Sequence, residues 1–294
     1  MSNEFQKLTI KDSFMFAAVM SDEEQCRRLL EISLDMEILS VRVITEKTFS
    51  YHPDYHGVRL DVFAVENGTQ RHFNVEMQVE RPKSLPRRTR YYHSQMDMDL
   101  LASGADYNLL PNTYVIFICD FAIFQTGPRL YRYTFRNRCD EDGRVLDDGH
   151  ITVLLSTKGE NDPEISSALR HFLKYVGNPE NPSKDTANDS YVRSLSAQIA
   201  AIKRSRSWEA KYVLFKEIMN QQWEAGHREG RQEGLLEGRI STLQEVIFQS
   251  LGQYGTLPDS LVSKIKNEKD ESVLTNWHLA ALKSSSLEDF TNNM

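Results

Sequence analysis

Asp61 and Glu76 form the acidic pair of this sequence that best fits a metal site. Each lies in a stretch that alternates polar and apolar residues, which predicts two β-strands. Two carboxylates that converge repel each other unless a cation lies between them. An oxygen-lined site with open positions suits Mg²⁺ or Mn²⁺, which keep bound waters and recruit phosphate oxygens. The pair therefore indicates metal-assisted attack of water on a phosphodiester.

A hairpin turn would bring the two acids together. Asn67-Gly68 separates the alternating runs, and this dipeptide is typical of a two-residue turn. With that turn Asp61 faces Asn74, and Glu76 lies one diagonal step away on the same face. The polar residues of that face are Arg59, Asp61, Asn74, Glu76, Gln78 and Glu80. A hairpin whose polar face is only hydrated gives the same pattern, and a loop longer by one residue would separate the two acids.

A basic run follows the hairpin. Its members are Arg81, Lys83, Arg87, Arg88 and Arg90, with Tyr91 and Tyr92 directly after them. The run contains no acid, although the chain has 35 basic and 42 acidic residues and a net charge of −7. Local positive charge of this kind binds a phosphate backbone. The tyrosines offer hydroxyl groups or stacking surfaces for nucleic acid, and core packing is the alternative for one of the two.

These motifs resemble a known family. Asp61, then Glu76-Met77-Gln78 and the basic Tyr-Tyr helix are similar to the PD-(D/E)XK nucleases, and more closely to their Rpn group of recombination-promoting nucleases, many of them labelled transposases. The matching segments are DSFMF at 12–16, RLDV at 59–62, NVEMQ at 74–78, RYY at 90–92, residues 104–111, the strand at 115–124 and the Glu-Gly repeats at 230–238. The resemblance is close over residues 5–125 and extends to the tail by texture.

The resemblance implies a DNA endonuclease that uses Mg²⁺, with Mn²⁺ as a substitute, and that serves recombination or transposition. Low sequence specificity is expected because phosphate contacts position a protein on DNA without distinguishing bases. Its implied metal ligands are Asp61, Glu76 and the Met77 carbonyl. The DNA contacts expected on the chain are Arg59, Arg87, Arg88, Arg90, Tyr91 and Tyr92. Asp12 or Glu31 would add an outer-shell carboxylate.

Gln78 departs from the superfamily, which usually has lysine at this position. An amide carries no charge and cannot act as a base, so Gln78 is expected to orient the attacking water. Positive charge for the transition state would come from the metal and from arginines such as Arg59 or Arg90. The missing lysine also supports an alternative function, a catalytically weak DNA-binding or assembly protein that keeps the nuclease fold.

The elements that must position these residues predict an α/β fold, with a mixed central sheet flanked by helices and a helical C-terminal extension. A capping box at Ser21 and Glu24 starts one helix, and Ser84 and Gly104 bound another. Strands are predicted at 40–49, 59–65, 71–79, 113–119, 130–135 and 151–155, and later helices at 164–176 and 191–220, with a loop at 177–190. Residues 257–290 predict two short helices.

Three segments are expected: a nuclease-like domain at 1–222, a glycine-striped helix at 223–250 and a small helical tail at 251–294. Glycines at 226, 230, 234 and 238 recur every four residues. Each costs a helix about 1 kcal/mol, so the repeat indicates either a closely packed second helix, as in a homo-oligomer, or a flexible connector.

Composition places the chain among ordinary proteins with a packed core: 40% of residues are hydrophobic and 26% charged, which excludes disorder over most of its length. Three scattered cysteines exclude a disulfide framework. His52 and His56 have the spacing of zinc ligands, but Pro53 between them favours a surface loop. Without a signal-peptide pattern or a membrane-spanning run, a cytoplasmic protein with no membrane partner is expected.

Overall fold

The chain divides into two compact units, Met1–Val213 and Leu214–Met294, in the computed structural model. The structure describes residues 3–45, 47–49, 58–69, 71–160 and 162–294, and His52 and His56 lie outside these ranges. The predicted segment boundaries at 222 and 250 stay predictions. Helix α8 (Arg206–Gly252) begins in the first unit and continues into the second.

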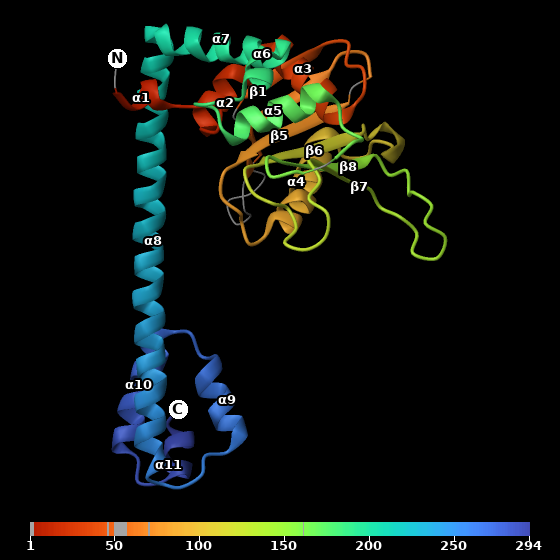
Figure 1. Cartoon of the computed structure of the whole chain (residues 1–294). Coiled ribbons are helices and arrows are strands. Elements are labelled where there is room, and N and C mark those ends of the chain that lie inside the picture. The colour runs from red at the N-terminus through yellow and green to blue at the C-terminus, as the bar shows by residue number, and fades with distance from the viewer. Residues whose placement is uncertain (1–2, 46, 50–57, 70, 161) are drawn as a thin grey trace. The chain divides into compact units, whose positions relative to one another are not determined.

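A mixed sheet of six strands, in the order β1-β4-β5-β6-β8-β7, forms the centre of the first unit (Figure 1). The strands are β1 (Val41–Thr45), β4 (Val62–Glu66), β5 (His72–Gln78), β6 (Thr113–Cys119), β7 (Arg132–Phe135) and β8 (His150–Ser156). β5, β6 and β8 run parallel, and the remaining neighbours are antiparallel. The predicted α/β class with a mixed sheet is confirmed.

Helices cover both faces of this sheet (Figure 1). Helix α4 (Leu85–Leu100) makes the crossover from β5 to the parallel strand β6 and packs on β6. Helices α2 (Ser13–Met20), α3 (Glu23–Leu34) and α5 (Ser167–Gly177) lie on the other side. Every residue of β6 is buried, as its nearly all apolar sequence predicts for a strand covered on both faces.

The β4–β5 hairpin has a longer connection than the predicted two-residue turn. Val62 pairs with Val75, and the Glu66 N–H donates to the Arg71 carbonyl over 2.9 Å. The connection therefore spans residues 67–70, and the register is shifted by two residues from the predicted one. Because side chains alternate with a period of two, this shift leaves every side chain on its predicted face. Continued by one residue, the observed register sets Asp61 opposite Glu76 rather than Asn74.

The polar face of the hairpin is covered in part by α4, with Asn74 and Glu76 buried and Gln78 half-buried. In the register of β5 on β6, Asn74, Glu76 and Gln78 pair with Val115, Phe117 and Cys119. Those three partners belong to the core cluster that contains Tyr92 and Met96 of α4. Arg59 lies outside the six-stranded sheet, in the two-stranded ribbon of β2 (Thr48–Phe49) and β3 (Val58–Arg59).

Several predicted boundaries are wrong because side-chain caps override local pattern. Asp22, not Ser21, caps α3, and its carboxylate accepts the N–H groups of Glu24 and Gln25. Ser166 caps α5 in the same way, so this helix begins at Ser167. The buried stripe of α3 contains Cys26, Leu29, Leu30 and Ser33, which follow the i, i+3, i+4, i+7 spacing of one helix face.

The later helices are also more finely divided than predicted. The expected loop at 177–190 contains α6 (Lys184–Asn188), capped by Ser183. The expected helix at 191–220 is split at Ser205 into α7 (Ser190–Arg204) and α8. The expected pair of tail helices is a set of three, α9 (Asp259–Asn267), α10 (Glu271–Lys283) and α11 (Leu287–Asn292). A short α1 (Asn3–Lys7) begins the described chain.

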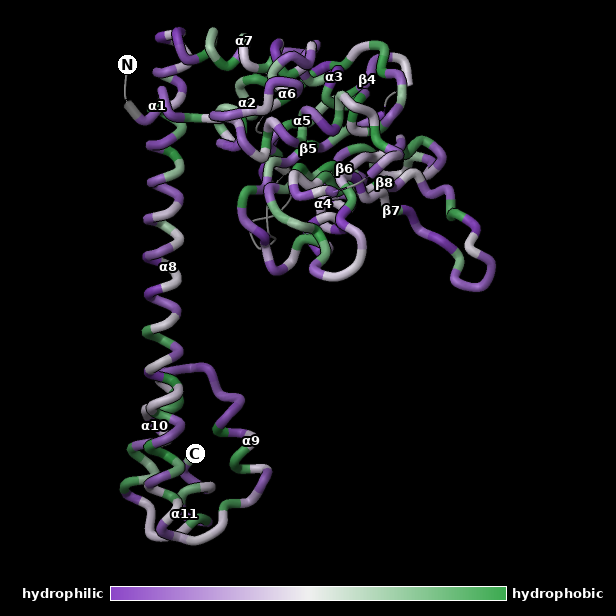
Figure 2. Tube along the Cα trace, in the orientation of Figure 1, coloured by the Kyte–Doolittle hydropathy of each residue, from purple (hydrophilic) through white to green (hydrophobic). Residues whose placement is uncertain are grey.

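The second unit has its own core. Ile247 and Leu251 of α8 pack with Ile265, Leu274 and Phe290 from the three tail helices. Polar residues predominate along the middle of α8 (Figure 2). Nothing in the described structure lies within 4 Å of a Cβ built at the glycines of this stretch, so no helix of the same chain packs on them there. Among the described helices, none is both long and apolar enough to cross a membrane.

Candidate active site

Asp61 and Glu76 meet where β4 begins and β5 approaches its end. The backbone N–H of Asp61 donates to Glu76 Oε1 over 3.2 Å, and the N–H of Met77 donates to Asp61 Oδ2 over 3.1 Å. Glu76 is 2% exposed, whereas Asp61 is half-buried. The structure therefore brings the two predicted carboxylates together, with one of them open to solvent.

The environment of Glu76 disfavours its charge. Burial and the nearby charge of Asp61 raise the pKa of Glu76 well above its usual range, against the opposing effects of the Asp61 N–H, the Arg88 charge and Asn74. A buried carboxyl group next to a second carboxylate keeps its proton until a cation compensates the charge. A cation beside the pair would offset this repulsion.

Gln78 connects the acidic pair to α4. Its Nε2 donates to the Met77 carbonyl over 3.0 Å, and its Oε1 accepts from Arg88 Nη1 over 3.1 Å. Arg88 Nη2 also donates to the Tyr92 hydroxyl over 2.5 Å and lies 3.9 Å from Glu76 Oε2. The three residues of the Glu76-Met77-Gln78 motif are therefore in contact with each other or with this arginine.

The remaining predicted DNA-binding residues occupy different surroundings. Arg87 and Arg90 are exposed on α4, and Tyr91 is half-buried. Tyr92 is 6% exposed and stacks on Phe117 with ring centroids 5.8 Å apart, so it is the tyrosine that packs in the core. Arg59 is half-buried in the small ribbon.

The two predicted outer-shell carboxylates have local partners. Asp12 Oδ2 accepts the Thr9 N–H over 2.5 Å at the start of α2. Glu31 pairs with Arg27 at 2.6 Å on α3. Among the described residues, neither carboxylate makes a hydrogen bond or an ion pair with Asp61 or Glu76, so the structure does not bring them to the site.

A charged cluster beside Gln78 was missed by the sequence analysis. The Asp120 N–H donates to the Gln78 carbonyl over 2.9 Å, and the Asp120 carboxylate pairs with Lys11 at 2.6 Å and Lys158 at 2.8 Å. These bonds hold the pKa of Asp120 below its ordinary value in spite of burial. The available signal was an acid directly after the apolar strand 113–119, because the carboxyl ends of parallel strands gather functional groups.

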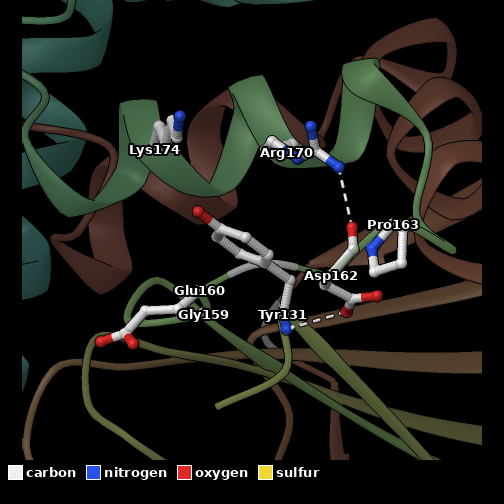
Figure 3. A pocket seen from close by; sticks show the side chains of 7 residues that line it. All are labelled: Tyr131, Gly159, Glu160, Asp162, Pro163, Arg170 and Lys174. Carbon is white, nitrogen blue, oxygen red and sulfur yellow. Dashed lines mark hydrogen bonds between the residues drawn. The ribbon is translucent and has the colours of Figure 1, made fainter. Parts of the chain in front are cut away.

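A separate cavity of about 690 Å³ lies elsewhere in the first unit, lined by Tyr131, Gly159, Glu160, Asp162, Pro163, Arg170 and Lys174. The Tyr131 ring points towards α5, which carries Arg170 and Lys174 (Figure 3). Arg170 donates to the backbone carbonyl of Asp162, and the side-chain carboxylate of Asp162 accepts the Tyr131 N–H. None of the predicted site residues lines this cavity.

A comparison with family models matches most of the chain. A family model described as PD-(D/E)XK nuclease family transposase matches residues 13–220, well over half of the chain. The chain belongs to this family. The resemblance predicted from the sequence is confirmed, and the matched range includes the whole sheet and α4. Searches of the curated proteins and of the solved structures found no match.

The donor groups of this PD-(D/E)XK site suit a hard divalent cation. They are two carboxylates and the Met77 carbonyl, all oxygen, and Mg²⁺ needs few protein ligands because it keeps several waters. Within the described ranges, no group of three or more His, Cys, Asp or Glu side chains is placed to hold a metal. The fit therefore rests on the acidic pair, in which burial and Asp61 disfavour the charge of Glu76 and the nearest Arg88 nitrogen lies 3.9 Å away.

Proposed function

We propose that this PD-(D/E)XK family protein is a Mg²⁺-dependent DNA endonuclease, with Mn²⁺ able to substitute. The observation that carries the proposal is the contact between Asp61 and Glu76, in which a half-buried and a fully buried carboxyl group share one end of the hairpin. Such a pair is costly in a fold without a cation. Family membership supports phosphodiester hydrolysis as the chemistry that uses it.

In this mechanism Asp61, Glu76 and the Met77 carbonyl hold the metal ion. When bound, the ion supplies a more acidic water and charge neutralisation at the phosphate. Gln78 positions the attacking water, because its amide can donate and accept but cannot take a proton. Its present bond to the Met77 carbonyl keeps that amide beside the acidic pair.

DNA binding is assigned to α4 and to the ribbon before it. Arg87 and Arg90 are exposed cations on α4 without acids between them, and Tyr91 and Arg59 are partly accessible. Contacts of this kind fix the position of the phosphate backbone but do not distinguish bases, so low sequence specificity follows. A role in recombination or transposition agrees with the family's description.

The test is nicking of a supercoiled plasmid by the full chain in Mg²⁺ and in Mn²⁺. Asp61→Asn and Glu76→Gln keep side-chain size and remove the metal-binding charge, and we expect each to lower cleavage by at least about 100-fold. Glu160→Gln is the matched control, since its carboxylate is 64% exposed and pairs only with Arg129 in the described structure. If the wild type cleaves and both site variants cleave equally well, the assignment is refuted. It is also refuted if the wild type cleaves in neither Mg²⁺ nor Mn²⁺.

A catalytically weak DNA-binding or assembly protein is the second candidate. Gln78 favours it through its lack of charge, and so does the exposure of Trp223, Leu235 and Leu236 on α8, where apolar side chains could bury against another copy of the chain. This candidate predicts DNA binding that weakens with salt and no strand cleavage in any divalent metal. Deleting residues 226–294 should then lower the number of subunits per oligomer, as measured from the mass in solution. An unchanged number of subunits would count against assembly.

A further inference from the structure

Arg88 is held rigidly at the candidate active site. Its Nη1 donates to Gln78 Oε1 and its Nη2 to the Tyr92 hydroxyl, over 3.1 and 2.5 Å. The guanidinium carbon lies 5.3 Å from the ring centroid of Tyr92 and 5.7 Å from that of Phe117. Two hydrogen bonds and two aromatic rings thus fix both the position and the plane of the group.

The charge of Arg88 faces the acidic pair. Its Nη2 is 3.9 Å from Glu76 Oε2, and in the described structure this is the ion pair that Glu76 makes. Arg90 is exposed on the same helix and makes no ion pair with any residue that the structure describes. Among the arginines of α4, the geometry therefore selects Arg88 as the cation of the site.

Arg88 also keeps donors for a ligand. A guanidinium has five N–H groups, and two of them serve Gln78 and Tyr92. Its Nε–H has no hydrogen-bond partner in the part of the chain that the structure describes, and 33% of the side chain is exposed. A planar donor group of this kind matches the oxygens of a phosphate.

We propose that Arg88 is a catalytic residue whose guanidinium binds a non-bridging oxygen of the scissile phosphate beside Asp61 and Glu76. Gln78 and Tyr92 are its positioning residues. Arg88 thus supplies the fixed positive charge that the neutral Gln78 cannot, and that charge counts most where negative charge develops in the transition state. This assignment rests on the proposed nuclease function and names a residue within it.

Three variants of the full chain test the assignment. Arg88→Gln removes the charge, Arg88→Lys keeps it without the planar group, and Arg144→Gln removes a charge from a side chain that is 85% exposed in a loop. At saturating DNA and Mg²⁺ we expect Arg88→Gln to lower the cleavage rate by about 100- to 1,000-fold. Arg88→Lys should recover part of that loss, and Arg144→Gln should cleave like the wild type.

Mn²⁺ binding without DNA separates this role from a structural one. Arg88→Gln removes a cation 3.9 Å from Glu76, so its affinity for Mn²⁺, measured by calorimetry, should equal or exceed that of the wild type. An equal loss of Mn²⁺ affinity and of cleavage would overturn the proposal, because Arg88 would then only be holding the acidic pair in place. Wild-type cleavage by Arg88→Gln would overturn it as well, while the proposed function would stand.

A third measurement is independent of cleavage. Duplex affinity is measured at several salt concentrations in Ca²⁺, and losing one phosphate contact should reduce the slope of log affinity against log salt by about 0.9. We expect that reduction in Arg88→Gln and not in Arg144→Gln. If Asp61→Asn and Glu76→Gln both cleave normally, the proposed function fails, but the salt slope still tests whether Arg88 contacts phosphate. An unchanged slope in Arg88→Gln rejects that contact.

Discussion

Arg71 closes the hairpin that sets Asp61 opposite Glu76, and its replacement should lower the free energy of unfolding. Its Nε and Nη2 donate to the two oxygens of Glu66 over 2.5 and 2.8 Å, and the Thr69 hydroxyl donates to the same carboxylate. Glu66 is 1% exposed. Burial by itself would raise the pKa of Glu66, but the bonds from Arg71 and Thr69 outweigh it and hold the pKa below its usual value.

The size of this loss follows from leaving the buried Glu66 carboxylate without the Arg71 guanidinium. Removing one partner of a buried ion pair costs about 3–5 kcal/mol in the free energy of unfolding. The Arg71 side chain is 20% exposed, so water would reach the abandoned carboxylate, and we expect the lower end, about 3 kcal/mol, for Arg71→Met at pH 7. Adding Glu66→Gln removes the charge itself and should recover about 2 kcal/mol, since replacing a whole buried pair is nearly neutral.

Urea unfolding at pH 7 and at pH 4 measures both quantities. A carboxyl group whose pKa is lowered by folding stabilises the fold above its ordinary pKa of 4.5, and this contribution disappears as the pH falls through the lowered value. In Arg71→Met the abandoned Glu66 takes up a proton readily, so the difference from the wild type should narrow at pH 4. A cost below about 1 kcal/mol at pH 7, or a double variant less stable than Arg71→Met, would refute this reasoning.

Three further outcomes are expected. Folding raises the pKa of Glu76, so this residue makes the free energy of unfolding of the wild type fall as the pH rises above 4.5. Glu76→Gln should remove that contribution, which urea unfolding from pH 4 to 8 measures. Burial lowers the pKa of His93 to about 4, so the wild type loses stability as the pH falls from 6.5, and His93→Gln should lose less in the same titration. Gly230→Ala should raise the thermal stability of the second unit, by about 1 kcal/mol of helix propensity. A fall in the solution mass of that variant would instead show that another helix packs on the glycine.

Much of the sheet could be predicted because its strands carry strong local signals. The run at 113–119 is nearly all apolar, and β6 has the same bounds. The hairpin was predictable from alternation, but its loop length was not. The buried pair of Glu66 and Arg71 closes the loop, and the sequence pattern around Asn67-Gly68 gives no sign of this pairing.

The contact between the acids could be anticipated, whereas the surroundings of the site could not. The predicted turn was too short, and the predicted register was therefore wrong by two residues. A shift of two residues keeps Asp61 and Glu76 on the same face, so the predicted convergence of the two acids still holds. That α4 covers this face is a property of tertiary packing. Arg88 and Tyr92 are visibly one helical turn apart in the sequence, but their contact with Gln78 depends on where α4 docks.

Two equally buried glutamates on neighbouring strands separate stability from function in this fold. Glu66 is 1% and Glu76 is 2% exposed, yet folding lowers the pKa of the first and raises that of the second. Desolvation contributes most to the raised pKa of Glu76, and the partners differ as well: Arg71 bonds Glu66 at 2.5 Å, while the nearest Arg88 nitrogen stands 3.9 Å from Glu76, with Asp61 adding repulsion. A fold that needed only stability would gain by pairing Glu76 or by replacing it with an apolar residue. Keeping an under-compensated acid at this position makes sense where a cation arrives with the substrate.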